Sequence, residues 1–249
     1  MRRVAHAGFV ALLVLVAVVL LALTGTVQSA FTFAAATYLV KGSEIRVIYS
    51  DAENIALGMK WVDGSVASAP DPVLVEYPAG FWPVSQGGLS DPTFNESVRQ
   101  GALALPRPNQ IGSRSVIWGY SQGAVVGSLY KREFNDYWAT HPGTPASVQY
   151  VYIANPMRPN GGFLSRFEPF GTIPVLGVTF YGPSPTTSPG WEPGDPPTTF
   201  DYARQYDGWT DWPTNPLNPV ATANALMGIL LIHDDYVSVG PETAISQGQ

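Results

Sequence analysis

Residues 115–126 decide the fold; they read SVIWGYSQGAVV, an apolar strand followed by Gly-x-Ser-x-Gly and a helix-forming segment. In this pattern the serine occupies a tight strand-to-helix turn, and glycines two positions before and after it let neighbouring elements approach. The turn lifts the serine hydroxyl out of the sheet, and the helix N-terminus directs its free N–H groups at the oxygen that becomes negative during acyl transfer. The pattern predicts Ser121 as a nucleophile and the Gln122 N–H as one oxyanion donor. The alternative is an ordinary serine in a glycine-rich turn.

Outward from this stretch, strand-length apolar segments alternate with helix-like ones, which favours an α/β fold with a mainly parallel central sheet and helices on both faces. Together with the serine turn, this predicts an α/β-hydrolase. The expected strands are Thr37–Val40, Val73–Tyr77, Ser115–Gly119, Val148–Ile153, Ile173–Phe180 and Phe200–Tyr206, and the expected helices are Glu53–Trp61, Phe94–Leu105 and Gln122–Trp138. The Pro/Gly-rich connections 78–92, 155–172 and 181–199 are too long for simple turns and are expected to be functional or mobile loops.

A nucleophilic serine needs a base, which is usually a histidine because imidazole exchanges protons near neutral pH. Three histidines are present. His6 lies in an N-terminal apolar segment and His141 in a His-Pro-Gly turn. His233 follows an apolar run near the C-terminus, where the order serine, acid, histidine places the base.

The acid should lie between Ser121 and His233. Of the aspartates in that interval, Asp136, Asp195 and Asp201 fall on a helix, in a Pro/Gly-rich loop and at the start of a strand. Asp207 and Asp211 both follow the strand 200–206. An aspartate three residues after a glycine on a post-strand loop favours Asp211, with Asp207 as the alternative, and the other of the two is expected to cap the loop.

The second oxyanion donor should come from the loop after the first strand, which reads Leu39-Val40-Lys41-Gly42-Ser43-Glu44. Ser43 could offer its N–H and its hydroxyl there, and a plain turn is the alternative.

Composition excludes several classes of protein. With a net charge of −6 and 13% charged residues, the chain has no basic stripe for nucleic acid. Without cysteine it has no disulfide and no thiol nucleophile. No metal-ligand cluster or phosphate loop is visible in the sequence, so we expect no metal and no cofactor. Residues 36–249 are long enough for a single domain with one sizeable core.

The N-terminus has the pattern of a targeting segment. Arg2 and Arg3 precede an apolar run from Ala7 to Leu23, followed by small and polar residues. We expect residues 1–30 to be a signal peptide or an uncleaved membrane anchor, and the rest of the chain to be exported and either secreted or held at the membrane.

Several segments resemble known families. Gly119–Ala124 is similar to the nucleophile turn of cutinases, and Lys41–Glu44 to their oxyanion loop. Four further segments resemble the mycobacterial PE-PPE C-terminal domain family: Asn155–Gly162, Tyr206–Pro213, Pro216–Asn218 and His233–Tyr236. The likeness spans roughly residues 36 to 240. Two departures stand out: the apolar segment takes the place of a PE or PPE module, and Lys41-Gly42-Ser43 replaces a glycine-rich turn.

The resemblance implies a cutinase-like α/β-hydrolase with a Ser-Asp-His triad that acts on acyl esters or lipids, in some members as a cell-envelope acyltransferase. It places Ser121, Asp211 and His233 in the triad positions, with Asp207 still open as the acid. An acyl-enzyme would pass its acyl group to water or to a sugar or lipid hydroxyl. The rival hypotheses are a non-catalytic envelope-binding protein and a peptidase. Aromatic residues in the long loops are candidates for an acyl site: Phe81, Trp82, Phe163, Phe167, Phe170 and Trp191.

Overall fold

The centre of the structure is a sheet of five parallel strands. The computed structural model describes residues 32–189 and 197–245, so the predicted targeting segment and Trp191 lie outside the described residues. The strands are β1 (Thr37–Val40), β2 (Pro72–Leu74), β3 (Ser115–Tyr120), β4 (Val148–Ile153) and β7 (Thr199–Tyr202). Their order is β2-β1-β3-β4-β7, and every neighbouring pair is parallel. The predicted α/β class with a parallel sheet is confirmed.

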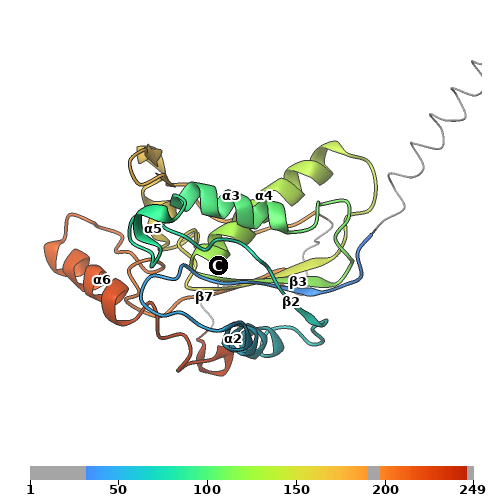
Figure 1. Cartoon of the computed structure of the whole chain (residues 1–249), viewed down its shortest axis with the longest axis horizontal. Coiled ribbons are helices and arrows are strands. Elements are labelled where there is room, and N and C mark those ends of the chain that lie inside the picture. Colours follow the sequence, from blue (N-terminus) through green and yellow to red (C-terminus); the bar gives the residue numbers. More distant parts are fainter. Residues whose placement is uncertain (1–31, 190–196, 246–249) are drawn as a thin grey trace, which may run out of the picture. The chain divides into compact units, whose positions relative to one another are not determined.

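Helices cover both faces of this sheet (Figure 1). The helix α2 (Asp51–Asp63) lies against one face, and α3 (Phe94–Ala104) and α4 (Gln122–Thr140) lie against the other. All three contain the helices expected from the sequence or match them to within one residue. The helix α2 begins at Asp51, two residues earlier than expected, because Ser50 and Glu53 cap each other's backbone N–H groups in a capping box.

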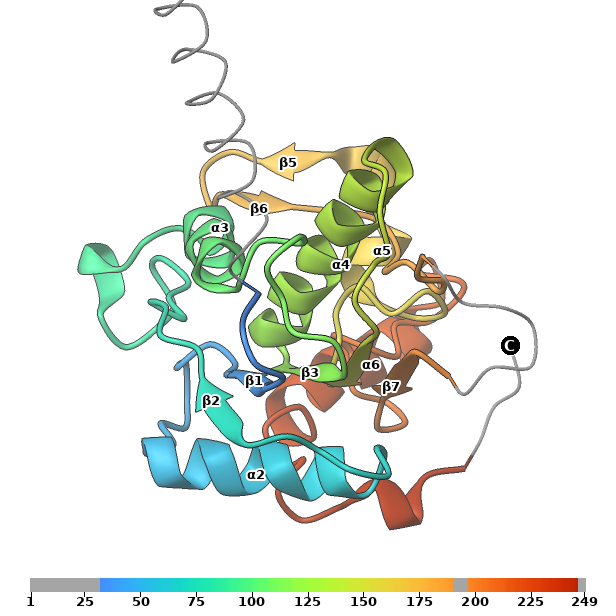
Figure 2. The same ribbon diagram turned by 90° about the vertical axis from the view of Figure 1, so that its right-hand side faces the viewer.

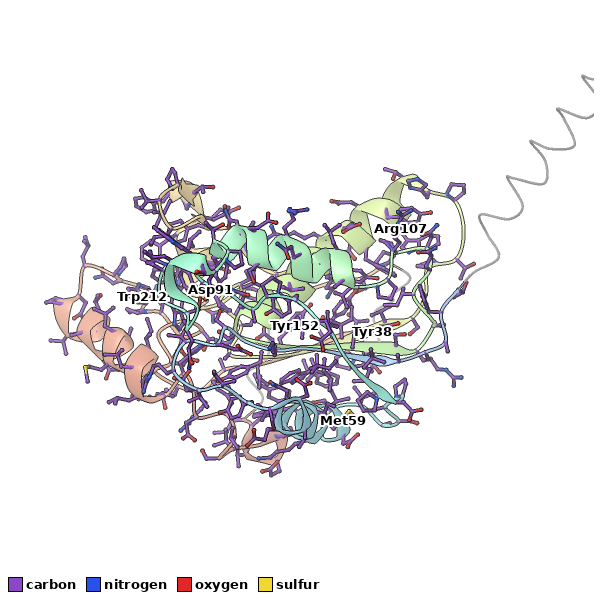
Figure 3. All side chains as sticks on the ribbon, in the orientation of Figure 1. Tyr38, Met59, Asp91, Arg107, Tyr152 and Trp212 are labelled. Carbon is purple, nitrogen blue, oxygen red and sulfur yellow. The ribbon has the colours of Figure 1, made fainter. Side chains whose placement is uncertain are left out.

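Two apolar cores result, one on each side of the sheet. Tyr38 and Tyr152 belong to the core shared with α3 and α4, whereas Trp118 belongs to the core beneath α2. Met59 packs at the edge of the second core, and Figure 3 shows it on the opposite side of the sheet from Tyr152. Because parallel strands covered on both faces bury both sets of side chains, their sequences are nearly continuous apolar runs.

Three of the expected strands were wrong in part. The strand expected over Val73–Tyr77 is observed only as β2, which ends at Leu74. Residues 173–180 do not join the main sheet. They contribute to a small antiparallel hairpin of β5 (Thr172–Ile173) and β6 (Val178–Thr179), which lies beside α3 and α4 (Figure 2). Gly177, with a φ of +55°, allows the reversal between them. The strand expected over residues 200–206 stops at Tyr202, because the next residues turn back to form the Asp207 N–H to Arg204 carbonyl hydrogen bond.

Several helical segments occur where the sequence predicted loops or where no element was predicted. The short helix α5 (Phe163–Arg166) and the 3₁₀ turns at Gly88–Ser90 and Glu168–Phe170 interrupt the long connections. A further 3₁₀ turn covers Pro241–Thr243. The helix α6 (Pro219–Leu231) was not predicted.

The start of α6 has a clear local cause. The side chain of Asn218 accepts hydrogen bonds from the N–H groups of Val220 and Ala221, and Pro219 occupies the first helical position. Among the helices that the structure describes, α6 included, none combines the length and apolar character needed to cross a membrane.

Candidate active site

Ser121 occupies the turn between β3 and α4 that the sequence predicted. Its backbone has a φ of +53° and a ψ of −112°, a conformation that costs a non-glycine residue energy and is typical of functional turns. The flanking glycines are required by close packing. A Cβ on Gly123 would lie 2.0 Å from the Val40 carbonyl oxygen, and one on Gly119 would lie 2.5 Å from the Gly123 carbonyl oxygen. The turn therefore exists only because both positions lack a side chain.

A line of hydrogen bonds connects Ser121, His233 and Asp207. The Ser121 Oγ lies 2.8 Å from the His233 Nε2. The His233 Nδ1 lies 3.0 and 2.9 Å from the two carboxylate oxygens of Asp207. Because an ionised carboxylate can only accept, Nδ1 carries the imidazole proton and Nε2 is left to accept the serine proton. This is the arrangement that a histidine base needs to activate a serine.

The geometry corrects the preferred acid. Asp207, the alternative, faces His233, whereas the carboxylate of Asp211 accepts a hydrogen bond from the Tyr206 N–H at 2.9 Å. The reason is the tightness of the turn, in which the Asp211 N–H bonds back to the Asp207 carbonyl at 2.6 Å. The assignment of Asp211 was wrong, and Asp211 instead caps the loop that begins at Tyr206, whose φ is +70°.

Two further donors hold the Asp207 carboxylate, which is fully buried. The Tyr236 hydroxyl donates to Oδ2 at 2.9 Å and the Trp209 N–H donates to Oδ1 at 3.1 Å. Burial and the charge of Asp207 raise the pKa of Tyr236 well above its usual value, so its hydroxyl keeps the proton that it donates. The same hydroxyl accepts from the Arg204 N–H at 2.9 Å and thereby joins the acid loop to the C-terminal segment.

The acid loop and the base are also joined through α6. A Cβ on Gly228 would lie 1.7 Å from the Tyr206 carbonyl oxygen, and one on Gly208 would lie 2.2 Å from the Ala225 carbonyl oxygen. The Gly228 carbonyl in turn accepts the His233 N–H at 3.1 Å. The two glycines let the helix touch the loop at backbone distance, which fixes where His233 and Asp207 meet.

On the other side, the nucleophile strand is tied to the base by Tyr120, whose hydroxyl donates to the His233 carbonyl at 3.0 Å. Tyr120 and Tyr236 were not singled out from the sequence as functional residues. Tyr236 lies three positions after His233 within a segment that resembled the PE-PPE family, which was the only available signal. Its contact with Asp207 spans 29 positions and no local pattern reveals it.

A pocket opens over Ser121 and His233, and its wall combines apolar side chains with the loop after β1. The apolar lining includes Ile45, Val47, Phe81, Phe94, Leu164 and Val178, and Ser43 lines the same pocket. Ser43 therefore lies in the wall of the pocket, and its role as the second oxyanion donor stays a prediction. The sequence assigned no role to Gly42, which belongs to the same loop. It packs against the nucleophile, because a Cβ there would lie 3.3 Å from the Cβ of Ser121.

Gln122 follows the nucleophile at the start of α4, and its side chain supports the turn from behind. Its N–H is the first of α4, and the first N–H groups of a helix have no partner within the helix. Its buried side chain donates to the Gly80 carbonyl at 2.8 Å and accepts from the Ser97 hydroxyl at 2.9 Å. The nucleophile turn is thereby fixed to the loop over residues 78–92.

The aromatic residues of the long loops mainly pack against one another. Phe163 contacts Phe167, Trp209 and Trp212, with ring centroids 4.8 to 5.2 Å apart. Of the candidates that the structure describes, Phe81 is the one that lines the pocket. Trp82 is half-buried, and Phe170 is exposed.

Comparison with known proteins identifies the family. The PE-PPE domain model matches residues 69–248, so the chain belongs to the PE-PPE domain family. Esterase PE16 of Mycobacterium tuberculosis is 38% identical over 173 residues, which cover 68% of this chain and 31% of that protein. The diacyltrehalose acyltransferase Chp2 of the same organism is 27% identical, over 68% of this chain and 48% of that protein. The chain thus spans less than half the length of these relatives.

Among solved structures, the catalytic core domain of acetyl xylan esterase from Trichoderma reesei is similar at a TM-score of 0.39 and 16% identity. The match covers 83% of this chain and 99% of that domain.

Proposed function

We propose that this protein is a serine esterase or acyltransferase that uses Ser121 as nucleophile, His233 as base and Asp207 as acid. The observation that carries the proposal is the unbroken line of hydrogen bonds from the Ser121 hydroxyl to the buried Asp207 carboxylate. His233 takes the proton of Ser121 while its oxygen attacks an ester carbonyl, and Asp207 stabilises the imidazolium that forms. His233 then returns the proton to the leaving alcohol, and an acyl-enzyme remains.

The proposed oxyanion donors are the N–H of Gln122 and the N–H of Ser43, with the Ser43 hydroxyl beside it. Support comes from the position of Gln122 at the N-terminus of α4 and of Ser43 in the pocket wall. Donors fixed before the reaction stabilise the negative oxygen without having to reorganise, which is commonly the largest single contribution to catalysis.

The proposed substrates are acyl esters of lipids. The apolar pocket wall supports an acyl chain as the bound group, and the relatives named as an esterase and an acyltransferase support transfer to water or to an alcohol. We further propose that residues 1–30 direct export and that the protein acts at the cell envelope, on the support of Arg2, Arg3 and the apolar run that follows them.

Turnover of p-nitrophenyl esters of graded chain length by the full chain tests this proposal, with Ser121→Ala as the inactive control. We expect Ser121→Ala to lower kcat by roughly 10⁴-fold or more, with residual activity from the oxyanion donors. A fluorophosphonate should label Ser121 in the native chain and not in the variant. Absence of both turnover and labelling would leave a non-catalytic envelope-binding protein as the better account.

The acceptor is tested separately by adding trehalose or a short alcohol to the ester assay. Transfer to the added hydroxyl, seen as a new ester by mass spectrometry, would assign an acyltransferase. Release of free acid alone would assign an esterase.

A further inference from the structure

The helix α6 has an unusual surface. It contains no charged residue, and in its sequence PVATANALMGILL only Thr222 and Asn224 are polar. Only Ala225 and Gly228 are buried. The side chains of Leu226, Met227, Leu230 and Leu231 are 50 to 69% exposed. A surface helix of a soluble domain normally turns polar residues outward, so this outward face has a role other than packing against its own domain.

The exposed face of α6 is continuous with a second apolar segment. Arg46 donates to the carbonyl of Leu230 and lies 3.4 Å from Asp234, which lines the pocket. On either side of Arg46, Ile45 and Val47 are exposed and also line the pocket. We define the apolar platform as the following exposed apolar residues: Leu226, Met227, Leu230 and Leu231 of α6, with Ile45, Val47 and Ile48. In Figure 1, α2 lies below the sheet and α3 and α4 lie above it, whereas α6 lies apart from all three.

We propose that the apolar platform docks this enzyme on the surface of an uncharged lipid aggregate, so that esters pass from the aggregate into the pocket over Ser121. The proposal rests on the proposed function, because it names the physical form in which the same site meets its substrate. A second protein seated on the platform would cover Ile45 and Val47 and close the pocket, whereas a lipid surface would present its esters at that opening. The lack of charge on α6 favours a neutral or zwitterionic surface, since basic residues are what anionic lipids attract.

The platform has the apolar character that interfacial binding uses. Binding strength there scales with the apolar area that enters the boundary between headgroups and acyl chains. Four large side chains on one helix face, each at least half exposed in solution, can bring apolar area into that boundary.

The first test measures docking without turnover, in a Ser121→Ala background. The chain has no native cysteine, so a single cysteine can carry an environment-sensitive fluorophore. It is placed at Leu226→Cys on the platform or, as the matched control, at Leu103→Cys on α3, where the side chain is 69% exposed away from the platform. With phosphatidylcholine vesicles, we expect a blue shift of the label at position 226 and none at position 103. No shift at 226, or equal shifts at both sites, would overturn the proposal.

Because the label reports without catalysis, this test can fail while esterase activity stands, and the reverse also holds. A blue shift of the 226 label that grows with protein concentration in the absence of vesicles, together with a dimer mass by light scattering, would assign the platform to a second copy and overturn the proposal.

The second test measures the consequence for catalysis with the triple variant Leu226→Gln, Met227→Gln, Leu230→Gln. None of these side chains lines the pocket. Turnover of an ester presented in vesicles should fall by about tenfold or more, while turnover of a dissolved short-chain ester should stay within about twofold. An equal fall on both substrates, or no fall on vesicles, would contradict docking through the platform.

Discussion

The two halves of the proposed triad are built in different ways. The nucleophile half is a continuous strand, turn and helix, held by backbone atoms that touch where glycines leave room. The acid and base half is assembled from a loop and a C-terminal segment, joined by side-chain hydrogen bonds such as the one from Tyr236 to Asp207. A turn made by the local chain is rigid because its failure would disrupt the sheet. A site assembled by loops depends on each connecting contact.

The largest expected effect distinguishes the two aspartates of the acid loop. Asp207→Asn removes the acceptor that fixes the proton on the His233 Nδ1, and we expect kcat to fall by roughly 10⁴-fold. Asp211→Asn changes a loop cap and should cost less than about tenfold, through stability rather than chemistry. Steady-state kinetics on a dissolved ester, with circular dichroism to verify folding, compares them. A more damaging Asp211→Asn would restore the assignment made from sequence.

A pair of glycine variants should break the halves in different ways. Gly123→Ala places a Cβ 2.0 Å from the Val40 carbonyl in the centre of the fold, and we expect it to lower the free energy of unfolding by about 3 kcal/mol or more. Gly228→Ala pushes the Tyr206 carbonyl and displaces the Asp207 loop at the edge of the domain. It should remain folded and lose roughly 10²-fold in kcat, because catalysis tolerates little misplacement.

Urea unfolding and kinetics of both variants check this pair. The opposite result, in which Gly228→Ala unfolds while Gly123→Ala keeps full activity, would contradict the expected difference between the two halves of the site.

A smaller effect is expected at Tyr236, a positioning residue for the acid. Tyr236→Phe removes one of the hydrogen bonds to the buried carboxylate but leaves those from His233 and Trp209. The lost hydrogen bond, which contributes about 1–1.5 kcal/mol to holding Asp207 in place, should lower kcat about tenfold and leave KM nearly unchanged. Tyr202→Phe is the matched control, since it loses only a 2.9 Å contact with Ser65, which makes no hydrogen bond to the triad. Equal kcat values for the two variants would exclude the positioning role.

The smallest effect concerns Asp201 in β7, the strand that precedes the acid loop, and its contribution to the pH dependence of stability. Burial raises the pKa of Asp201, at the end of β7, to about 6, although Asn155 donates to its carboxylate at 2.8 Å. Because its pKa is higher in the folded state, protonated Asp201 stabilises the folded protein at low pH. This contribution to the free energy of unfolding is lost as the pH rises from about 4 to about 6. Asp201→Asn should remove that part of the pH dependence of unfolding, measured in urea at pH 4 to 7, without changing kcat. An unchanged pH dependence would contradict the proton uptake at Asp201.

The sequence by itself determined the fold class, and it named the residues that we propose as nucleophile and base. Strands β1 and β4 were predicted residue for residue, and Ser121 lies in the turn that its glycines required, because these features depend on neighbours within a few residues. His233 was identified by elimination among three histidines and by its place near the C-terminus.

Only the tertiary structure decided between Asp207 and Asp211, because the two stand in one short loop and their side-chain directions depend on a turn closed by the Asp211 N–H. It also revealed Tyr236 as the partner of the acid and α6 as an exposed apolar helix. Apart from Thr222 and Asn224 the sequence of α6 is apolar, so its pattern alone gives no clear period to mark which face is buried. Which face stays in contact with solvent was settled by Gly208 and Gly228, which bring the helix and the acid loop together across the fold.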